Sequence, residues 1–260
     1  GYQDNGHWQL GARWEEQEND NGKNIRRRPF EASDRFVTQE DRTETDLFTA
    51  HGYTEYTIGE TGRVTAGALY TTLDRNVTGS RIYGPDYDSP FDPNFPRQNF
   101  DEGILDLHVD GEVEQYIVNA NYSVMLLRDL AFVLAGRAES LDSEARSAFI
   151  ETNFVSFRGG ASAEELAAES DNDWEELAAE MELRYSGIEN AILGANVYLA
   201  TGEGDLYENE IHVDDGSLAF ERRTDSDRDE LKIGVDRKFY PQPGVSVAVG
   251  YYYRIYDWDY

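Results

Sequence analysis

The sequence predicts an all-β chain, and more narrowly an antiparallel, up-and-down transmembrane β-barrel. Three observations support this prediction. Apolar and polar residues alternate over segments of about ten residues, short connections alternate strictly with long ones, and aromatic residues recur beside the short connections. About nine strands are visible, and we interpret residues 1–260 as a single β-barrel domain that is part of a larger barrel.

Alternation with a period of two is clearest in four segments. Apolar side chains occupy every second position in 8–14, 116–126 (with exceptions at Ile117 and Met125), 177–185 and 245–255. Such residues lie on one face of a strand. Five further segments fit less cleanly: 46–58, 63–73, 130–140, 191–200 and 230–240. Strands of about ten residues can cross a bilayer at a tilt, which fits a membrane barrel.

The lengths of the connections distinguish a membrane barrel from a soluble β-sandwich, in whose strands apolar and polar residues also alternate. Four of them are very short: Gly59–Gly62, Leu127–Asp129, Gly187–Asn190 and Pro241–Gly244. Between these lie long loops, expected at 18–44, 74–112, 141–173 and 201–228. Soluble domains seldom carry loops of that length. Tight turns on one side of a membrane and long loops on the other are typical of outer-membrane barrels.

Aromatic residues lie near the short connections and on the apolar faces. Tyr56, Phe132, Tyr185 and Phe239 are each within a few residues of a short turn. Such rings favour the lipid headgroup boundary, so they predict an interfacial girdle. The alternative is ordinary core packing, and the pattern of loops favours the girdle.

Composition narrows the possible functions. The chain has 52 acidic and 23 basic residues, a formal charge of −29, and no cysteine. Such a charge repels nucleic acid and attracts cations or a basic partner; a hydrated surface suited to high salt is the simpler interpretation. Without cysteine, the chain forms no disulfide, thiolate metal site or covalent c-type haem attachment. No apolar stretch is long enough for a transmembrane helix.

The succession of strand, turn, strand and loop resembles outer-membrane porin-like β-barrels as a broad class. The resemblance implies a bacterial outer-membrane location, contact with membrane lipid, and a channel for ions or small solutes with acidic external loops. Large barrels that sheathe multihaem cytochromes share acidic loops and Tyr-rich strands. The alternative function is therefore a structural or partner-binding barrel that surrounds another envelope protein or presents adhesive loops.

Residues on the polar faces are candidates to line the lumen. They are His51, Tyr53, Glu55, Arg63, Asn119, Asn121, Arg137, Glu180, Glu182, Arg184, Asn196, Tyr252 and Arg254. Both signs of charge occur among them, as in pores where opposed charges create a transverse field. An interior plugged by hydrogen-bonded ion pairs would use the same residues.

Metal binding is predicted in one acidic loop, and residues 225–229 and 214–216 carry weaker versions of the same pattern. Asp86, Asp88 and Asp92 lie among prolines and supply oxygen ligands of the kind that calcium prefers, although the spacing is not that of an EF-hand. A solvated, turn-rich loop is the simpler interpretation, and no other cofactor is expected.

Residues 162–169 carry a capping box followed by helix formers, which predicts a short helix in the third long loop.

Catalysis is not expected. The four histidines (His7, His51, His108 and His212) are scattered and lack metal-ligand spacing. A hydrolase would need a nucleophile beside an oriented base, and no such motif is visible. We therefore interpret the chain as a protein without enzymatic activity.

Overall fold

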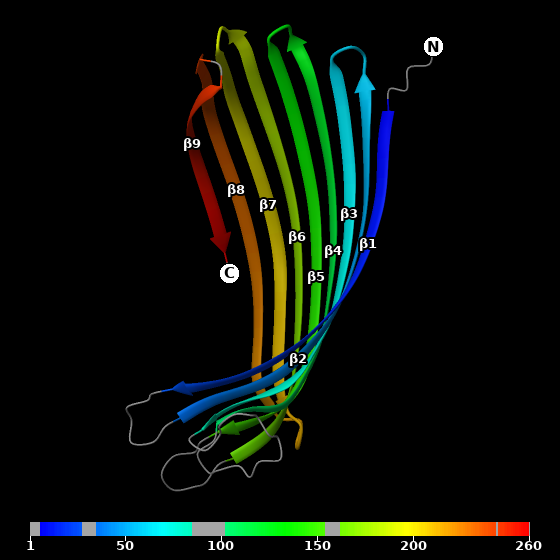
Figure 1. Ribbon diagram of the computed structural model, residues 1–260, viewed down its shortest axis with the longest axis vertical. Coiled ribbons are helices and arrows are strands. Elements are labelled where there is room, and N and C mark those ends of the chain that lie inside the picture. The colour runs from blue at the N-terminus through cyan, green and yellow to red at the C-terminus, as the bar shows by residue number, and fades with distance from the viewer. Residues whose placement is uncertain (1–5, 28–34, 85–101, 154–161, 243, 260) are drawn as a thin grey trace.

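The computed structural model describes residues 6–27, 35–84, 102–153, 162–242 and 244–259, and these form one β-sheet (Figure 1). Nine strands pair antiparallel in chain order without a crossover. They are β1 (Gly6–Arg27), β2 (Arg35–Ile58), β3 (Gly62–Gly84), β4 (Glu102–Leu127), β5 (Leu130–Asn153), β6 (Ser162–Ile188), β7 (Ala191–His212), β8 (Leu218–Gln242) and β9 (Val245–Asp259). The prediction of an all-β, antiparallel, up-and-down chain is confirmed. In the described part of the chain, no helix could span a membrane.

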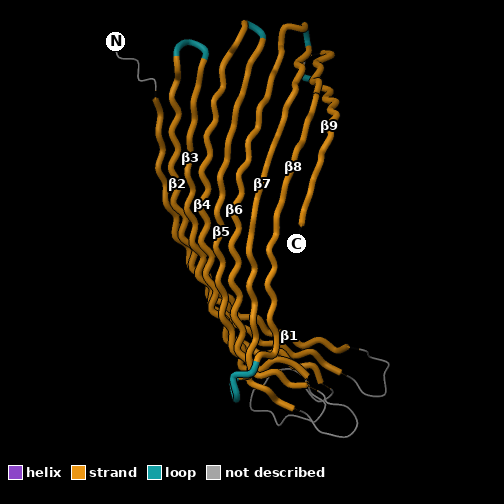
Figure 2. Tube along the Cα trace, turned by 180° about the vertical axis from the view of Figure 1, so that it is seen from behind, coloured by secondary structure: helices purple, strands orange, loops and turns teal. Residues whose placement is uncertain are grey.

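The four predicted short turns all join neighbouring strands at one end of the sheet (Figure 2). β2 ends at Ile58 and β3 begins at Gly62, and each of the other three hairpins leaves two residues between its strands. Gly59 and Asn190 adopt positive φ values of 63° and 57° in two of these turns. Glycine and asparagine accept this left-handed backbone more readily than other residues, so the turn sequences fix these hairpins.

The predicted long loops are wrong in extent, because the strands continue through most of them. Strand lengths range from 15 residues in β9 to 27 in β6, well beyond the expected ten or so. The extensions of β1 to β6 curve strongly towards their distal ends, which are the ends opposite the short turns, whereas those of β7 and β8 are straighter (Figures 1 and 2). Polar residues predominate in most extensions, so the apolar alternation weakens there although the backbone ladder persists. The β4 extension is an exception, because Leu105, Leu107, Val109 and Val113 occupy alternate positions.

The short helix predicted at 162–169 is also wrong. These residues open β6, and they pair with 146–153 of β5 from Ser162↔Asn153 to Glu169↔Arg146. Arg146 makes an ion pair of 3.0 Å with Glu169 across the two strands. Propensity for helix is a weak preference that the pairing partner overrides.

Register assigns each residue to one of two faces, since side chains alternate along a strand and cross-strand partners share a face. One face carries the apolar residues and the other the polar ones. The apolar face is the exposed one: Leu10 is 73% exposed, Leu177 62% and Val249 68%. On the opposite face Glu230 is 9% exposed. This inverts the arrangement of a soluble domain, and we call the two faces outward and inward.

The sheet is unclosed, as expected for part of a larger barrel. β1 and β9 form its edges, and both run from the short-turn end towards the distal end. Outward apolar side chains are most exposed on these edges: Leu10 and Tyr251 are each 73% exposed, against 48% for Leu199 on β7. An antiparallel closure would need strands that run in the opposite direction beside both edges.

Candidate functional site

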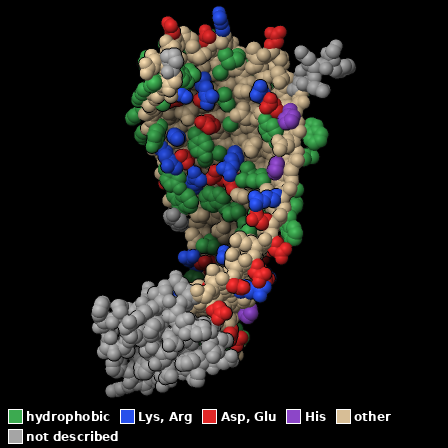
Figure 3. Space-filling view, in the orientation of Figure 1, with side chains coloured by type: hydrophobic (Ala, Val, Ile, Leu, Met, Phe, Trp, Pro, Cys, Tyr) green, Lys and Arg blue, Asp and Glu red, His purple; other side chains and the backbone are tan. Residues whose placement is uncertain are grey.

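All of the predicted lumen residues lie on the inward face. The pairing runs through His51↔Leu69, Asn119↔Arg137, Glu182↔Asn196 and Lys232↔Arg254, so their side chains leave the sheet on one side. Figure 3 shows this face hollowed, with basic and acidic side chains gathered across it. Whether these residues line an open lumen stays a prediction.

Several of these residues meet in small groups. Asn121, Glu180, Glu182 and Arg184 line a hollow of about 350 Å³ on the inward face. The Asn196 side-chain amide donates a hydrogen bond of 3.2 Å to Glu180. At the other side of the sheet, Arg63 lies 3.3 Å from Glu55. His51 stays apart from these groups and lies over Gly11, where its ring fills the space of a missing side chain.

An ion-pair network across β6, β8 and β9 was not predicted from the sequence. Arg228 contacts Glu176 on one side and Glu230 at 2.9 Å on the other, and Glu230 also contacts Arg254 at 2.7 Å. The side chain of Glu230 is 7% exposed and that of Glu176 11%. Buried charges need such partners, because desolvation is costly without them. Only Arg254 of this network was among the predicted lumen residues.

Aromatic rings cover this network on the inward face. The guanidinium groups of Arg228 and Arg254 lie 5.7 and 4.8 Å from the centre of the Tyr256 ring. Trp174 stacks on Trp258 with centroids 5.8 Å apart and an interplanar angle of 13°. A side chain at Gly204 would come within 2.6 Å of the Trp174 ring, so the glycine makes room for the stack. The network is therefore held by stacking and cation–π contacts as well as by ion pairs.

The outward face carries rows of carboxylates that only the register reveals. Six consecutive strands place acidic residues directly opposite one another: Glu16, Asp46, Asp74, Glu112, Glu144 and Asp171. A second row runs over five strands: Glu114, Asp142, Asp173, Asp205 and Asp225. These rows lie distal to the apolar positions of the same face. Like charges in direct opposition destabilise a sheet unless they are screened or neutralised.

The pKa values of two aspartates in the second row are raised, in line with this repulsion. Desolvation and the negative charge of Asp171 raise the pKa of Asp142 above its ordinary value. Desolvation and the charge of Asp142 raise the pKa of Asp173 in the same direction. Carboxylate oxygens of Asp142, Asp171 and Asp173 lie within 4.8 Å of one another, an arrangement that could hold a cation. The calcium candidates Asp86, Asp88 and Asp92 lie outside the described residues.

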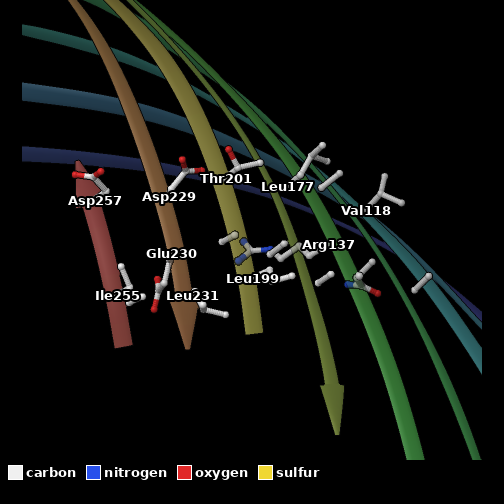
Figure 4. Close-up of a pocket in the computed structure, with 17 residues that line it drawn as sticks. Val118, Arg137, Leu177, Leu199, Thr201, Asp229, Glu230, Leu231, Ile255 and Asp257 are labelled. Carbon is white, nitrogen blue, oxygen red and sulfur yellow. The ribbon is translucent and has the colours of Figure 1, made fainter. Parts of the chain in front are cut away.

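The apolar part of the outward face has a shallow depression of about 880 Å³ (Figure 4). Its floor holds small residues such as Ala120, Gly136 and Ala138, and its walls hold larger ones such as Leu177 and Leu199. Figure 4 shows Asp229 and Asp257 level with Thr201 and Leu177, on the β8 and β9 side of these apolar side chains. The depression therefore has an apolar body and an acidic margin.

No family model matches the sequence, and no curated protein does. Among solved structures, the chain is similar to the ferric yersiniabactin uptake receptor FyuA from Yersinia pestis, with a TM-score of 0.39 and 8% identity over 98% of this chain and 50% of that one. It is similar to the outer membrane protease OmpT from Escherichia coli, with a TM-score of 0.36 and 13% identity over 97% and 82%. It is similar to a chain of the RagAB peptide importer, with a TM-score of 0.38 and 12% identity over 87% and 33%. The chain spans about half the length of the receptor.

The architecture itself gives the class of protein. Antiparallel strands in chain order, an exposed apolar face and a charged opposite face are the features of an outer-membrane-type β-barrel. Strands can cross a bilayer only within such a structure, because all backbone groups must be paired there. The predicted broad class is confirmed by this architecture, and barrels of this class occur in outer membranes.

Proposed function

We propose that this chain supplies much of the wall of an outer-membrane channel for ions and small solutes. The observation that carries the proposal is the distribution of charge over two faces of one sheet. Charged groups such as Glu230 and Arg228 lie on the more sheltered inward face, while Val249 and Leu10 project outward. A wall with lipid on its apolar side encloses water on its polar side. The proposal assigns no catalytic reaction to the chain.

The channel is proposed to prefer cations. The four arginines predicted to line the lumen are each paired with a glutamate: Arg63 with Glu55, Arg137 with Glu139, Arg184 with Glu182 and Arg254 with Glu230. Their charge is therefore largely compensated. The carboxylate rows lie on the outward face distal to the apolar zone, and the chain as a whole carries a formal charge of −29, so the distal end has an unbalanced negative field. Fixed negative charge there raises the local cation concentration.

Planar-bilayer recording of the purified protein tests the channel and its selectivity together. Under a salt gradient, the reversal potential should show cation preference at low ionic strength. The preference should fade near 1 M salt, where the screening length falls to about 3 Å. Glu182→Gln should shift selectivity towards anions because it releases Arg184, whereas the outward control Glu175→Gln should change it less. Anion preference in the unmodified protein would contradict the assigned selectivity.

A second function, a structural or partner-binding barrel, is favoured by the inward network itself. The pairs that join Glu176, Arg228, Glu230 and Arg254 hold side chains of three strands against the wall, as a plugged or partner-filled interior would require. The partner proposed is another envelope protein seated inside the barrel, such as a multihaem cytochrome. If the purified protein shows no conductance and another envelope protein co-purifies with it at a fixed stoichiometry, the structural or partner-binding function is supported instead of the channel.

A further inference from the structure

The depression on the outward face lies within the apolar zone, where the barrel wall meets lipid. Its residues form rows across neighbouring strands: Val118 pairs with Ala138, Ala138 with Leu177, and Leu177 with Thr201. Small side chains in the floor and leucines around it leave a volume of about 880 Å³. That volume falls in the range of about 300–1,000 Å³ that binds small ligands. An apolar chain is the occupant that fits such a lining.

The same rows become acidic at one side of the depression. Thr201 pairs with Asp229, and Asp229 with Asp257, and both carboxylates line the depression. One step further from the short turns, Glu203 pairs with Asp227 and Asp227 with Asp259. Asp229 and Asp257 are exposed. A ligand in the depression would therefore meet the carboxylates of Asp229 and Asp257 along its β8 and β9 side.

We propose that this depression docks a membrane lipid whose headgroup carries a protonated amine. The acyl chain lies over Ala138 and between Leu177 and Leu199, and the ammonium group reaches Asp229 and Asp257. Charge complementarity selects the headgroup: an ammonium forms charge-assisted hydrogen bonds with carboxylates, whereas a purely anionic headgroup is repelled. The depression lies in the apolar, lipid-facing zone, and this position favours a ligand that has an acyl chain. A water-soluble cation would leave the apolar floor uncovered.

Native mass spectrometry of the detergent-purified protein, incubated with defined lipids, tests the proposal. The probes are phosphatidylethanolamine, phosphatidylcholine and phosphatidylglycerol, with equal acyl chains. Phosphatidylethanolamine should be retained best. The double variant Asp229→Asn/Asp257→Asn should lose this preference by about two- to fivefold, the range expected for partly exposed charge pairs. The charge-conserving variant Asp229→Glu/Asp257→Glu should keep it.

A second pair of variants tests the floor. Ala138→Leu fills the depression and should reduce retention of all three lipids. Ala68→Leu is the matched control, since Ala68 lies on the same outward row, opposite Val118, but outside the depression. Equal retention by the two alanine variants would overturn the assigned position.

Three other results would overturn the proposal. Equal retention of the three headgroups would show that the acidic margin selects nothing. Retention of phosphatidylglycerol that requires divalent cations and is abolished by a chelator would show cation-bridged anionic lipid instead. A basic amphipathic peptide that displaces every lipid would identify a protein partner. None of these measurements depends on conductance. If lipid docking is refuted, the proposed channel is unaffected, and if the channel is refuted, the proposed lipid docking is unaffected.

Discussion

Replacing Asp142 with Asn should stabilise the folded sheet, although it removes a charged group from a polar surface. Asp142 lies on β5 directly opposite Glu114 on β4 and Asp173 on β6. Its carboxylate therefore faces a like charge on each side, and each such pair costs about 0.2–1 kcal/mol. Asp142 is exposed, so solvent screening reduces the sum. We expect a gain of about 0.5–1 kcal/mol in the free energy of unfolding.

Urea unfolding of the protein in detergent micelles, followed by tryptophan fluorescence, measures this difference. The gain should be largest at low ionic strength. It should shrink towards zero at 1 M salt, where charges are screened beyond about 3 Å. Ser140→Asn is the matched control, because Ser140 lies on the outward face of the same strand and the change alters no charge. It should leave the unfolding midpoint unchanged at either salt concentration.

The same residue predicts a pH dependence of definite sign. The pKa of Asp142 is raised in the folded protein, so the folded state binds a proton more tightly than the unfolded chain. The group therefore destabilises the fold above the raised pKa, and this cost disappears as pH falls through it. Stability should rise as the pH falls through the raised pKa towards the ordinary pKa of an aspartate. Asp142→Asn should flatten this part of the profile.

Two outcomes would refute this reasoning. If Asp142→Asn destabilised the protein at low salt, the carboxylate would be stabilised by a bound cation rather than strained by its neighbours. If the gain were independent of salt, its origin would not be electrostatic. The inward variant Glu139→Gln provides a contrast of opposite sign, since it removes the partner of Arg137 at 2.6 Å and should lower stability.

Three further predictions concern other parts of the sheet. Val249→Arg should cost about 2–4 kcal/mol in a lipid-folding assay, whereas Ser246→Arg on the inward face should escape this lipid penalty; equal costs would refute the assignment of faces. Glu230→Gln should lower the free energy of unfolding by about 1–3 kcal/mol in the same assay, since a buried acceptor of two arginines is weakened, and no change would show that the network is dispensable. Protease added outside intact cells should cut in 213–217, which joins β7 to β8, rather than in 59–61; the reverse would show an inverted topology.

The sequence predicted the fold most reliably where alternation coincided with turn chemistry. The hairpins around Gly59 and Asn190 could be located because glycine and asparagine readily adopt the left-handed backbone that the turns use. The strand 177–185 was predicted despite its helical composition, because apolar residues recur there at every second position. Most of the distal extensions, and β6 from Ser162, were not predicted, because polar residues predominate in them and the strand period is weak in hydropathy. The β4 extension differs, since apolar residues recur at alternate positions from Leu105 to Val113 and a strand could have been predicted there.

For the site, the sequence assigned residues to a face but not to partners. A period of two fixes the side of the strand for Glu182 or Arg254 from local sequence alone, since alternation is a property of one strand. Arg228 and Glu176 are 52 positions apart, and the in-register row from Glu16 to Asp171 spans six strands. Such neighbours depend on the register of every intervening hairpin, which is set by turn geometry and cross-strand packing. The sequence by itself thus determined which side of the wall each residue occupies, and only the tertiary structure decided which charges meet, because that depends on how the strands align.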